Sequence, residues 1–249
     1  MVFFLAAVVG PSRAETLVSS SFSSGRERVS LVGLSEDQSP QSPDGSNVAG
    51  EPWRLSGGGS VDGWMWDDAA RVRNGGAVAV SLGGRNANAI LTISADITFD
   101  VPESGDLANP LSEEELLKRQ NEFKGGKAIL GFYSEVPAQA YGFRYKAYTG
   151  LQVNVDGSLQ LYVHGVPSGS PISYGGIFDP ELPVILTYSV NTTTGALTKV
   201  SLGTSTATYH FPTAAFTREA TAFAGFGGSL GNGPLYISFR DFSVVASVP

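Results

Sequence analysis

The chain has 249 residues, of which 31 are glycine, 14 are proline and only 16 % are charged. This composition favours many short elements separated by turns, because helix-rich soluble proteins carry more Lys and Glu on their exposed faces. A net charge of −7 and a pI near 4.8 argue against nucleic acid as a partner, since its phosphates repel an acidic protein. The absence of cysteine excludes disulfides, thiolate zinc sites and cysteine nucleophiles.

The first fourteen residues, MVFFLAAVVGPSRA, combine an apolar run with a small-residue site that ends at Ala14. This arrangement predicts a secretory signal peptide over residues 1–14, although the usual basic residues at its start are missing. Cleavage before Glu15 would leave one domain over residues 15–249 of a secreted or cell-surface protein. The alternative is that the run forms a first strand. The run is too short to cross a bilayer, so we expect no membrane span.

Alternating apolar residues predict strands in much of the chain that follows. In ILTISADITFDV the odd positions from Leu91 to Val101 form a set that we expect to be buried, because alternate side chains of a strand share one face. One short helix is expected over residues 112–123, where Ser112 and Glu115 form a capping box. The helix lies between two predicted strands, so we interpret it as an insertion in a β scaffold.

The segment LQVNVDGSLQLYVHG predicts a hairpin with one apolar and one polar face. A two-residue loop of Asp156 and Gly157 would place Val153 opposite Gln160 and would mix the two faces. A three-residue loop places Val153 opposite Leu159, with Gly157 at the position that needs a positive φ. We therefore expect the three-residue loop.

Two features of strand pairing are visible nearer the C-terminus. The segment VILTYSVNTTTGALTKVSL predicts a hairpin that turns at residues 191–195, and the turn explains its Asn-Thr-Thr sequence better than N-glycosylation does. In YISFRDFSVVA the apolar parity changes around Arg240 and Asp241, which predicts a β-bulge. No linker interrupts the chain, so a single domain is expected.

Four segments resemble concanavalin A-like (LamG-like) jelly-roll domains of exported bacterial proteins. They are the two predicted hairpins, which contain LQVNVDGSLQLY and LTYSVNTTTGALTKVSL, and the segments AFAGFGG and ISFRDFSVVA. The resemblance covers residues 17–246 and implies an all-β fold, a two-sheet antiparallel jelly-roll sandwich with one short inserted helix. Lectins, binding modules, glycoside hydrolases and polysaccharide lyases all use this fold, so the site must decide the function.

Polar residues alternate with apolar residues along the hairpin of residues 151–165 and along the predicted strand before it, residues 142–148. We expect these polar residues on the concave sheet. They would form a cationic and aromatic groove that binds a polysaccharide or cell-surface glycan without catalysis. An ordinary solvated sheet face is the competing interpretation. The predicted binding residues are Arg144, Lys146, Tyr148, Gln152, Asn154, Gln160, Tyr162 and His164.

Two other functions remain open at this point. A polysaccharide lyase or glycoside hydrolase would use Tyr162 or His164 to transfer a proton. The paired-carboxylate pattern Glu-x-Asp-x-(x)-Glu, which retaining hydrolases of this fold need, does not occur in the sequence. A structural envelope protein without a small ligand is the second alternative.

The sequence predicts no cofactor. Two histidines and no cysteine do not indicate a transition-metal site. Calcium prefers oxygen ligands, and the carboxylates that offer them do not have the spacing of an EF-hand loop. The candidate calcium ligands are Asp62, Asp67, Asp68 and Asp241.

Overall fold

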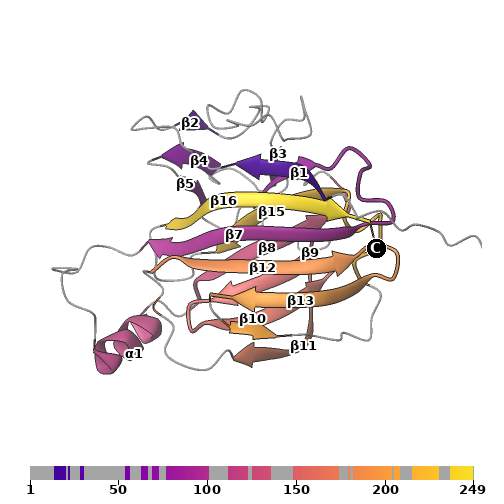
Figure 1. Ribbon diagram of the computed structural model, residues 1–249. Coiled ribbons are helices and arrows are strands. Elements are labelled where there is room, and N and C mark those ends of the chain that lie inside the picture. The colour runs from indigo at the N-terminus through magenta and orange to yellow at the C-terminus, as the bar shows by residue number, and fades with distance from the viewer. Residues whose placement is uncertain are drawn as a thin grey trace, which may run out of the picture.

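The chain folds into two antiparallel β-sheets that lie face to face, as the computed structural model shows (Figure 1). The described residues form sixteen strands and one helix. The predicted all-β two-sheet sandwich with one inserted helix is therefore confirmed. The structure describes residues 14–20, 22, 29–30, 54–56, 63–66, 69–72, 77–100, 112–122, 125–135, 148–173, 179, 182–203, 205–207, 215–229 and 236–248.

The first sheet has nine strands and holds the longest strands of the molecule, β7 and β16 (Figure 1). Across this sheet the order is β14 (Ser205–Ala207), β13 (Ala196–Leu202), β12 (Val184–Asn191), β7 (Ile90–Asp100), β16 (Tyr236–Ser247), β5 (Ala69–Val72), β4 (Gly63–Trp66) and β2 (Val29–Ser30). Off this path, β1 (Glu15–Ser20) also pairs with β16.

The second sheet has seven strands, and the predicted hairpin of residues 151–165 lies near one of its edges. The order across it is β11 (Val166–Ser173), β10 (Ser158–Val163), β9 (Tyr148–Asn154), β8 (Lys127–Tyr133), β15 (Phe223–Ser229), β6 (Ala77–Ser81) and β3 (Arg54–Ser56).

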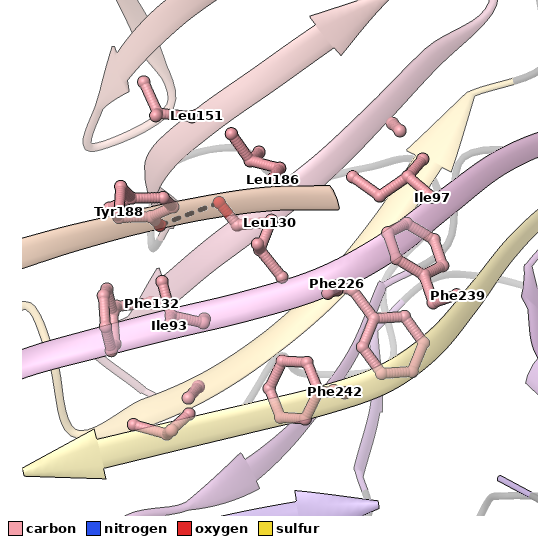
Figure 2. Packing of buried hydrophobic residues seen from close by; sticks show 14 of the residues in the cluster. Ile93, Ile97, Leu130, Phe132, Leu151, Leu186, Tyr188, Phe226, Phe239 and Phe242 are labelled. Carbon is pink, nitrogen blue, oxygen red and sulfur yellow. Dashed lines mark hydrogen bonds between the residues drawn. The ribbon is translucent and has the colours of Figure 1, made fainter. Parts of the chain in front are cut away.

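Alternation in β7 supplies the middle of the core. Every second residue from Leu91 to Phe99 is fully buried, as the sequence predicted, and Val101, the last of the predicted set, lies outside the described residues. From the facing sheet, Phe226 of β15 packs against β16, with its ring 4.6 Å from that of Phe239 and 5.4 Å from that of Phe242 (Figure 2). The facing surfaces of the two sheets thus bury each other, which is what makes a sandwich stable in water.

A hydrogen bond crosses this apolar core and joins the sheets. The Tyr188 hydroxyl of β12 donates to the Leu130 carbonyl oxygen of β8 at 2.8 Å (Figure 2). Burial raises the pKa of Tyr188 well above its ordinary value of 10.0, so the hydroxyl keeps its proton and stays a donor. The bond satisfies a buried hydroxyl that would otherwise destabilise the core.

The hairpin between β9 and β10 has the predicted register. Val153 pairs with Leu159, Leu151 pairs with Leu161, and Gly157 has a φ of 76°. The three-residue loop is confirmed, and with it the separation of an apolar face from a polar face. The hairpin between β12 and β13 also turns at residues 191–195, where the Gly195 N–H donates to the Asn191 carbonyl oxygen.

The helix α1 (Glu113–Glu122) begins with the predicted capping box. The Ser112 N–H donates to the Glu115 carboxylate, and the Glu115 N–H donates to the Ser112 hydroxyl. In Figure 1 the helix stands away from both sheets, at one end of the sandwich. Within the described part of the chain, no helix has the length and apolar content needed to cross a membrane.

Strand β16 contains the predicted bulge. Its register with β7 shifts between Arg240 and Ser243, and Asp241 has a φ of 47°. On its other edge, β5 pairs with residues 237–239 and β1 pairs with residues 242–246. The bulge therefore lies where β16 changes from one neighbouring strand to another.

Replacement of Phe226 by alanine is expected to destabilise the fold by about 3–5 kcal/mol, because the cavity left between β15 and β16 cannot collapse fully. Urea denaturation followed by tryptophan fluorescence measures the loss. Leu182→Ala, at a side chain that is 61 % exposed, serves as the control and should change stability by less than about 0.5 kcal/mol. Equal effects of the two substitutions would contradict the assignment of Phe226 to the core.

Asp96 of β7 is expected to make stability depend on pH. Burial raises the pKa of its carboxyl. The positive charge of Arg240 lowers this pKa, and the negative charge of Asp241 raises it further. The ionised form is therefore disfavoured in the folded state, so the folded protein loses stability as the pH rises through the raised pKa.

Asp96→Asn should consequently stabilise the protein at pH 7, and this advantage should shrink as the pH falls towards 3.8, the ordinary pKa of the group. Urea denaturation of both proteins at several pH values checks this. Glu135→Gln removes a charge at an exposed position and is the control. An advantage of Asp96→Asn that grows at acidic pH would refute the explanation.

Candidate functional site

A hollow of about 320 Å³ lies on the seven-stranded sheet at the hairpin of β9 and β10. We call it the amide-lined hollow, because three of its side chains carry amides. Its lining consists of Gly125, Gly126, Lys127, Gln152, Asn154, Val155, Asp156, Gln160, Tyr162, Pro167 and Pro171.

Strand alternation places the amides on the sheet face that points away from the core. Val153 and Leu159 point into the sandwich and are buried there, so Gln152 and Gln160 point the other way. The two glutamines are direct cross-strand partners, and both are almost fully buried, with 3 % and 6 % exposure. Two large amide side chains are thus held side by side, which is unusual for the outer face of a sheet.

A chain of hydrogen bonds fixes the side chains at the β9 end of the hollow. The Gln152 amide nitrogen donates to Asn154 Oδ1 at 2.6 Å, and the Asn154 amide nitrogen donates to Ser158 Oγ at 2.8 Å. Ser158 Oγ in turn donates to Asp156 Oδ1 at 2.6 Å. At the far end of the chain, the buried Gln152 Oε1 accepts no hydrogen bond.

Gln160 is held by a bulge in the edge strand. Leu159 pairs with Ile172, and Leu161 pairs with Ser168. β11 therefore has more residues between these two pairs than β10 has. A bulge leaves backbone groups without ladder partners. The Gln160 amide nitrogen donates to two of them, the carbonyl oxygens of Ser168 at 3.1 Å and Gly169 at 3.2 Å.

Tyr162 adds an aromatic side chain to the hollow and is half-buried. Its ring lies 6.1 Å from that of Tyr148, at an angle of 46°. A tyrosine in this position offers both an apolar ring face and a polar hydroxyl.

Tyr148, one of the predicted binding residues, does not line the hollow. Tyr148 is fully buried, and its hydroxyl donates to the carbonyl oxygens of Leu130 and Leu151. Its side chain lies over Gly131 and Gly150, where an added Cβ atom would come within 3 Å of the ring at Gly131 and of the hydroxyl oxygen at Gly150. Strand alternation put Tyr148 on the correct face, but the space above the two glycines lets the ring fold down onto the sheet.

His164 also departs from the prediction, since it does not line the hollow. It forms a two-residue turn with Gly165 between β10 and β11, and the φ angles of these residues are 47° and 75°. Two positive φ angles are typical of a type I′ hairpin turn. The polar face of β10 therefore ends before His164, and the exposed imidazole belongs to the turn.

The remaining predicted residues are placed as follows. Arg144 and Lys146 lie outside the described residues, as do Asp62, Asp67 and Asp68. Asp241 is exposed at the β16 bulge, on the other sheet from the hollow. In the described ranges, no group of three or more His, Cys, Asp or Glu side chains could hold a metal ion.

The structure adds residues that the sequence argument missed. Lys127 is the cross-strand neighbour of Asn154 and therefore faces the hollow. Asp156 was assigned only to the turn, although its carboxylate anchors the hydrogen-bond chain. Pro167 and Pro171 belong to β11, a strand without the apolar alternation that would have revealed it. Of these, only Lys127 has a readable signal in the sequence, because the apolar residues of a strand follow it directly.

Several solved structures are similar to this chain. Arcelin-5, a lectin-like defense protein from Phaseolus vulgaris, is 9 % identical, covers 96 % of this chain and 99 % of its own, and has a TM-score of 0.48. Peanut lectin is 12 % identical over 88 % and 97 %, with a TM-score of 0.49. The Emp46p carbohydrate recognition domain is 11 % identical over 86 % and 94 %, with a TM-score of 0.46.

All three likenesses have TM-scores below 0.5 and identities of 9–12 %, so the fold assignment rests on the two sheets of this chain alone. No protein-family model matches the chain, and no curated protein matches it in sequence.

Gln160→Leu is expected to destabilise the protein by about 1–3 kcal/mol, because the carbonyl oxygens of Ser168 and Gly169 lose their donor. Urea denaturation measures the change. Lys199→Ala, on the exposed side of β13, is the control and should stay within about 0.5 kcal/mol of the parent. A neutral Gln160→Leu would show that the amide does not hold the bulge.

Proposed function

We propose that this protein is an exported, non-catalytic β-sandwich that binds polysaccharide at a cell surface, and that the amide-lined hollow is its binding site. The observation that carries the proposal is the convergence of Gln152, Asn154, Gln160 and Tyr162, four of the predicted binding residues, on one hollow. Its volume of about 320 Å³ is within the range of small-molecule sites.

The chemistry of the lining suits a sugar. Saccharides present hydroxyl groups around a ring whose faces are partly apolar, and they are bound by amide hydrogen bonds combined with aromatic contact. The hollow has amide groups for hydrogen bonding at Gln152 and Gln160, and the half-buried Tyr162 ring offers the aromatic contact.

The catalytic alternative receives less support from the geometry. Proton transfer to and from a polysaccharide needs an acid and a base at the same reacting group. Of the two residues considered for this role, Tyr162 lines the hollow and His164 lies on the exposed turn. No observation favours a lyase or hydrolase over a binding protein.

A glycan-array screen, with and without calcium, tests the proposed function, together with ultraviolet detection of unsaturated products. We expect saturable binding and no products. Tyr162→Ala should weaken binding by about tenfold or more, which corresponds to about 1.4 kcal/mol for the lost aromatic contact. Isothermal titration with the best glycan of the array measures the loss.

His164→Asn is the matched control, because asparagine tolerates the positive φ of this turn position and the residue lies outside the hollow. Its affinity should equal that of the parent. Unsaturated products that disappear in Tyr162→Phe would establish a lyase instead. If the array shows no binding and no unsaturated products form, a structural envelope protein becomes the better description.

A further inference from the structure

The residues that line the hollow differ greatly in the surface that they expose to a ligand. Gln152 and Gln160 are almost fully buried, so they offer a ligand little contact. Pro167 and Pro171 are exposed, and Tyr162 is half-buried. The surface that a ligand can touch therefore comes mainly from these three ring side chains and from the polar residues on the other side of the hollow.

Strand order separates the ring side chains from the polar ones. The strands β8, β9, β10 and β11 are neighbours in this order. Tyr162 of β10 and Pro167 of β11 are cross-strand partners, and Pro171 also belongs to β11. Lys127 of β8 and Asn154 of β9 are cross-strand partners on the other side. We call Tyr162, Pro167 and Pro171 the ring wall, since together they form the apolar side of the hollow.

The ring wall owes its position to the bulge in β11. This strand has three residues, 169–171, opposite Gln160 alone. Gly169 has a φ of 72°, a conformation that glycine adopts without strain. The Gln160 amide nitrogen holds the bulge by donating to two of its backbone carbonyl oxygens. Pro171 lies within the bulge and Pro167 lies just before it, so the shape of the bulge decides where both prolines meet the hollow.

The polar side of the hollow has donors and an acceptor but no net charge. Among the lining residues, Lys127 is positively charged and Asp156 is negatively charged, so their charges balance. Asp156 Oδ1 already accepts from the backbone N–H and the hydroxyl of Ser158. The Asn154 amide nitrogen carries two hydrogens and gives one to Ser158, which leaves the other for a ligand. Hydroxyl groups, which both donate and accept, suit this set, whereas a charged group gains no net attraction from it.

Resting on the proposed function, we infer that the hollow binds neutral pyranosides, with an apolar face of the sugar ring against the ring wall. The hydroxyls along the edge of the sugar then meet Lys127, Asn154 and Asp156. A pyranose carries C–H groups on its faces and hydroxyls around its edge, so its two kinds of surface match the two sides of the hollow. Gln160 is a positioning residue, because it holds the bulge that carries the prolines of the ring wall.

Saturation-transfer NMR with small sugars tests this inference, because it shows which sugar protons lie against the protein. The probes are the methyl β-glycosides of glucose and galactose, together with the glycosides of glucuronic acid and glucosamine as charged analogues. We expect a neutral glycoside to bind, with the strongest transfer to the C–H protons of one ring face. The charged analogues should bind no more tightly than the neutral ones.

Two pairs of variants test the ring wall and the bulge. Tyr162→Phe keeps the ring and should bind within about threefold of the parent, whereas Tyr162→Leu should bind about tenfold more weakly. Gly169→Ala should weaken binding by about threefold or more, because alanine disfavours a φ of 72° and the bulge must shift. Gly84→Ala is the matched control. Gly84 has a φ of 76°, an added Cβ atom meets no neighbour at either glycine, and Gly84 lies outside the hollow. Both alanine variants should lose similar stability, and only Gly169→Ala should lose affinity.

The outcomes separate this inference from the proposed function. Parent affinity in Tyr162→Leu, or a charged analogue that binds more tightly than both neutral glycosides, would overturn the inference and leave saccharide binding intact. Equal affinities of Gly169→Ala and Gly84→Ala would overturn the role of the bulge. If the glycan array finds a ligand but neither neutral glycoside binds, the inference is wrong and the proposed function stands. If the array shows no saccharide binding, both are wrong.

Discussion

The burial of two sheet faces against each other is the constraint on which the other features depend. β7 commits alternate residues to the core, and Phe226 fills the space between β15 and β16. Because each strand has only two sides, every residue that the core does not take must lie on an outer face. This alone directs Gln152 and Gln160 to one surface. The Tyr188 hydrogen bond to Leu130 then ties the strand that neighbours the hairpin to the opposite sheet.

The seven-stranded sheet differs from an ordinary β surface because its outer face is itself partly packed. Tyr148 and Tyr133 are buried there together with small residues of β6, although they point away from the main core. The amide pair next to them is therefore held in place by its surroundings. A binding group that is already ordered loses little conformational entropy when a ligand arrives. One consequence of this packing is that Gln152 Oε1 is buried without a hydrogen-bond partner among the described residues.

Much of the fold was predictable because it depends on local rules. The Gly157 loop, the Ser112 capping box and the bulge near Asp241 each follow from parity or from a few neighbouring residues. The site was less predictable, because parity gives the face of a side chain but not its conformation. The alternation of residues along a strand could not show that Tyr148 folds onto two glycines or that His164 belongs to a turn. Arg144 and Lys146 lie outside the described residues, so their part of the predicted groove stays a prediction.

Strand β11 forms one edge of the seven-stranded sheet, as Figure 1 shows. It carries Pro167 and Pro171, which have no N–H to offer, and a bulge whose carbonyl oxygens are used by Gln160. Prolines and bulges at an edge disfavour the addition of another strand, so this edge is protected against self-association of the sheet. Pro167 and Pro171 also line the hollow, which therefore extends to the edge of the seven-stranded sheet as far as the described residues show it. Under the proposed function, a long polymer lying across that edge would be bound along its length as well as at its end.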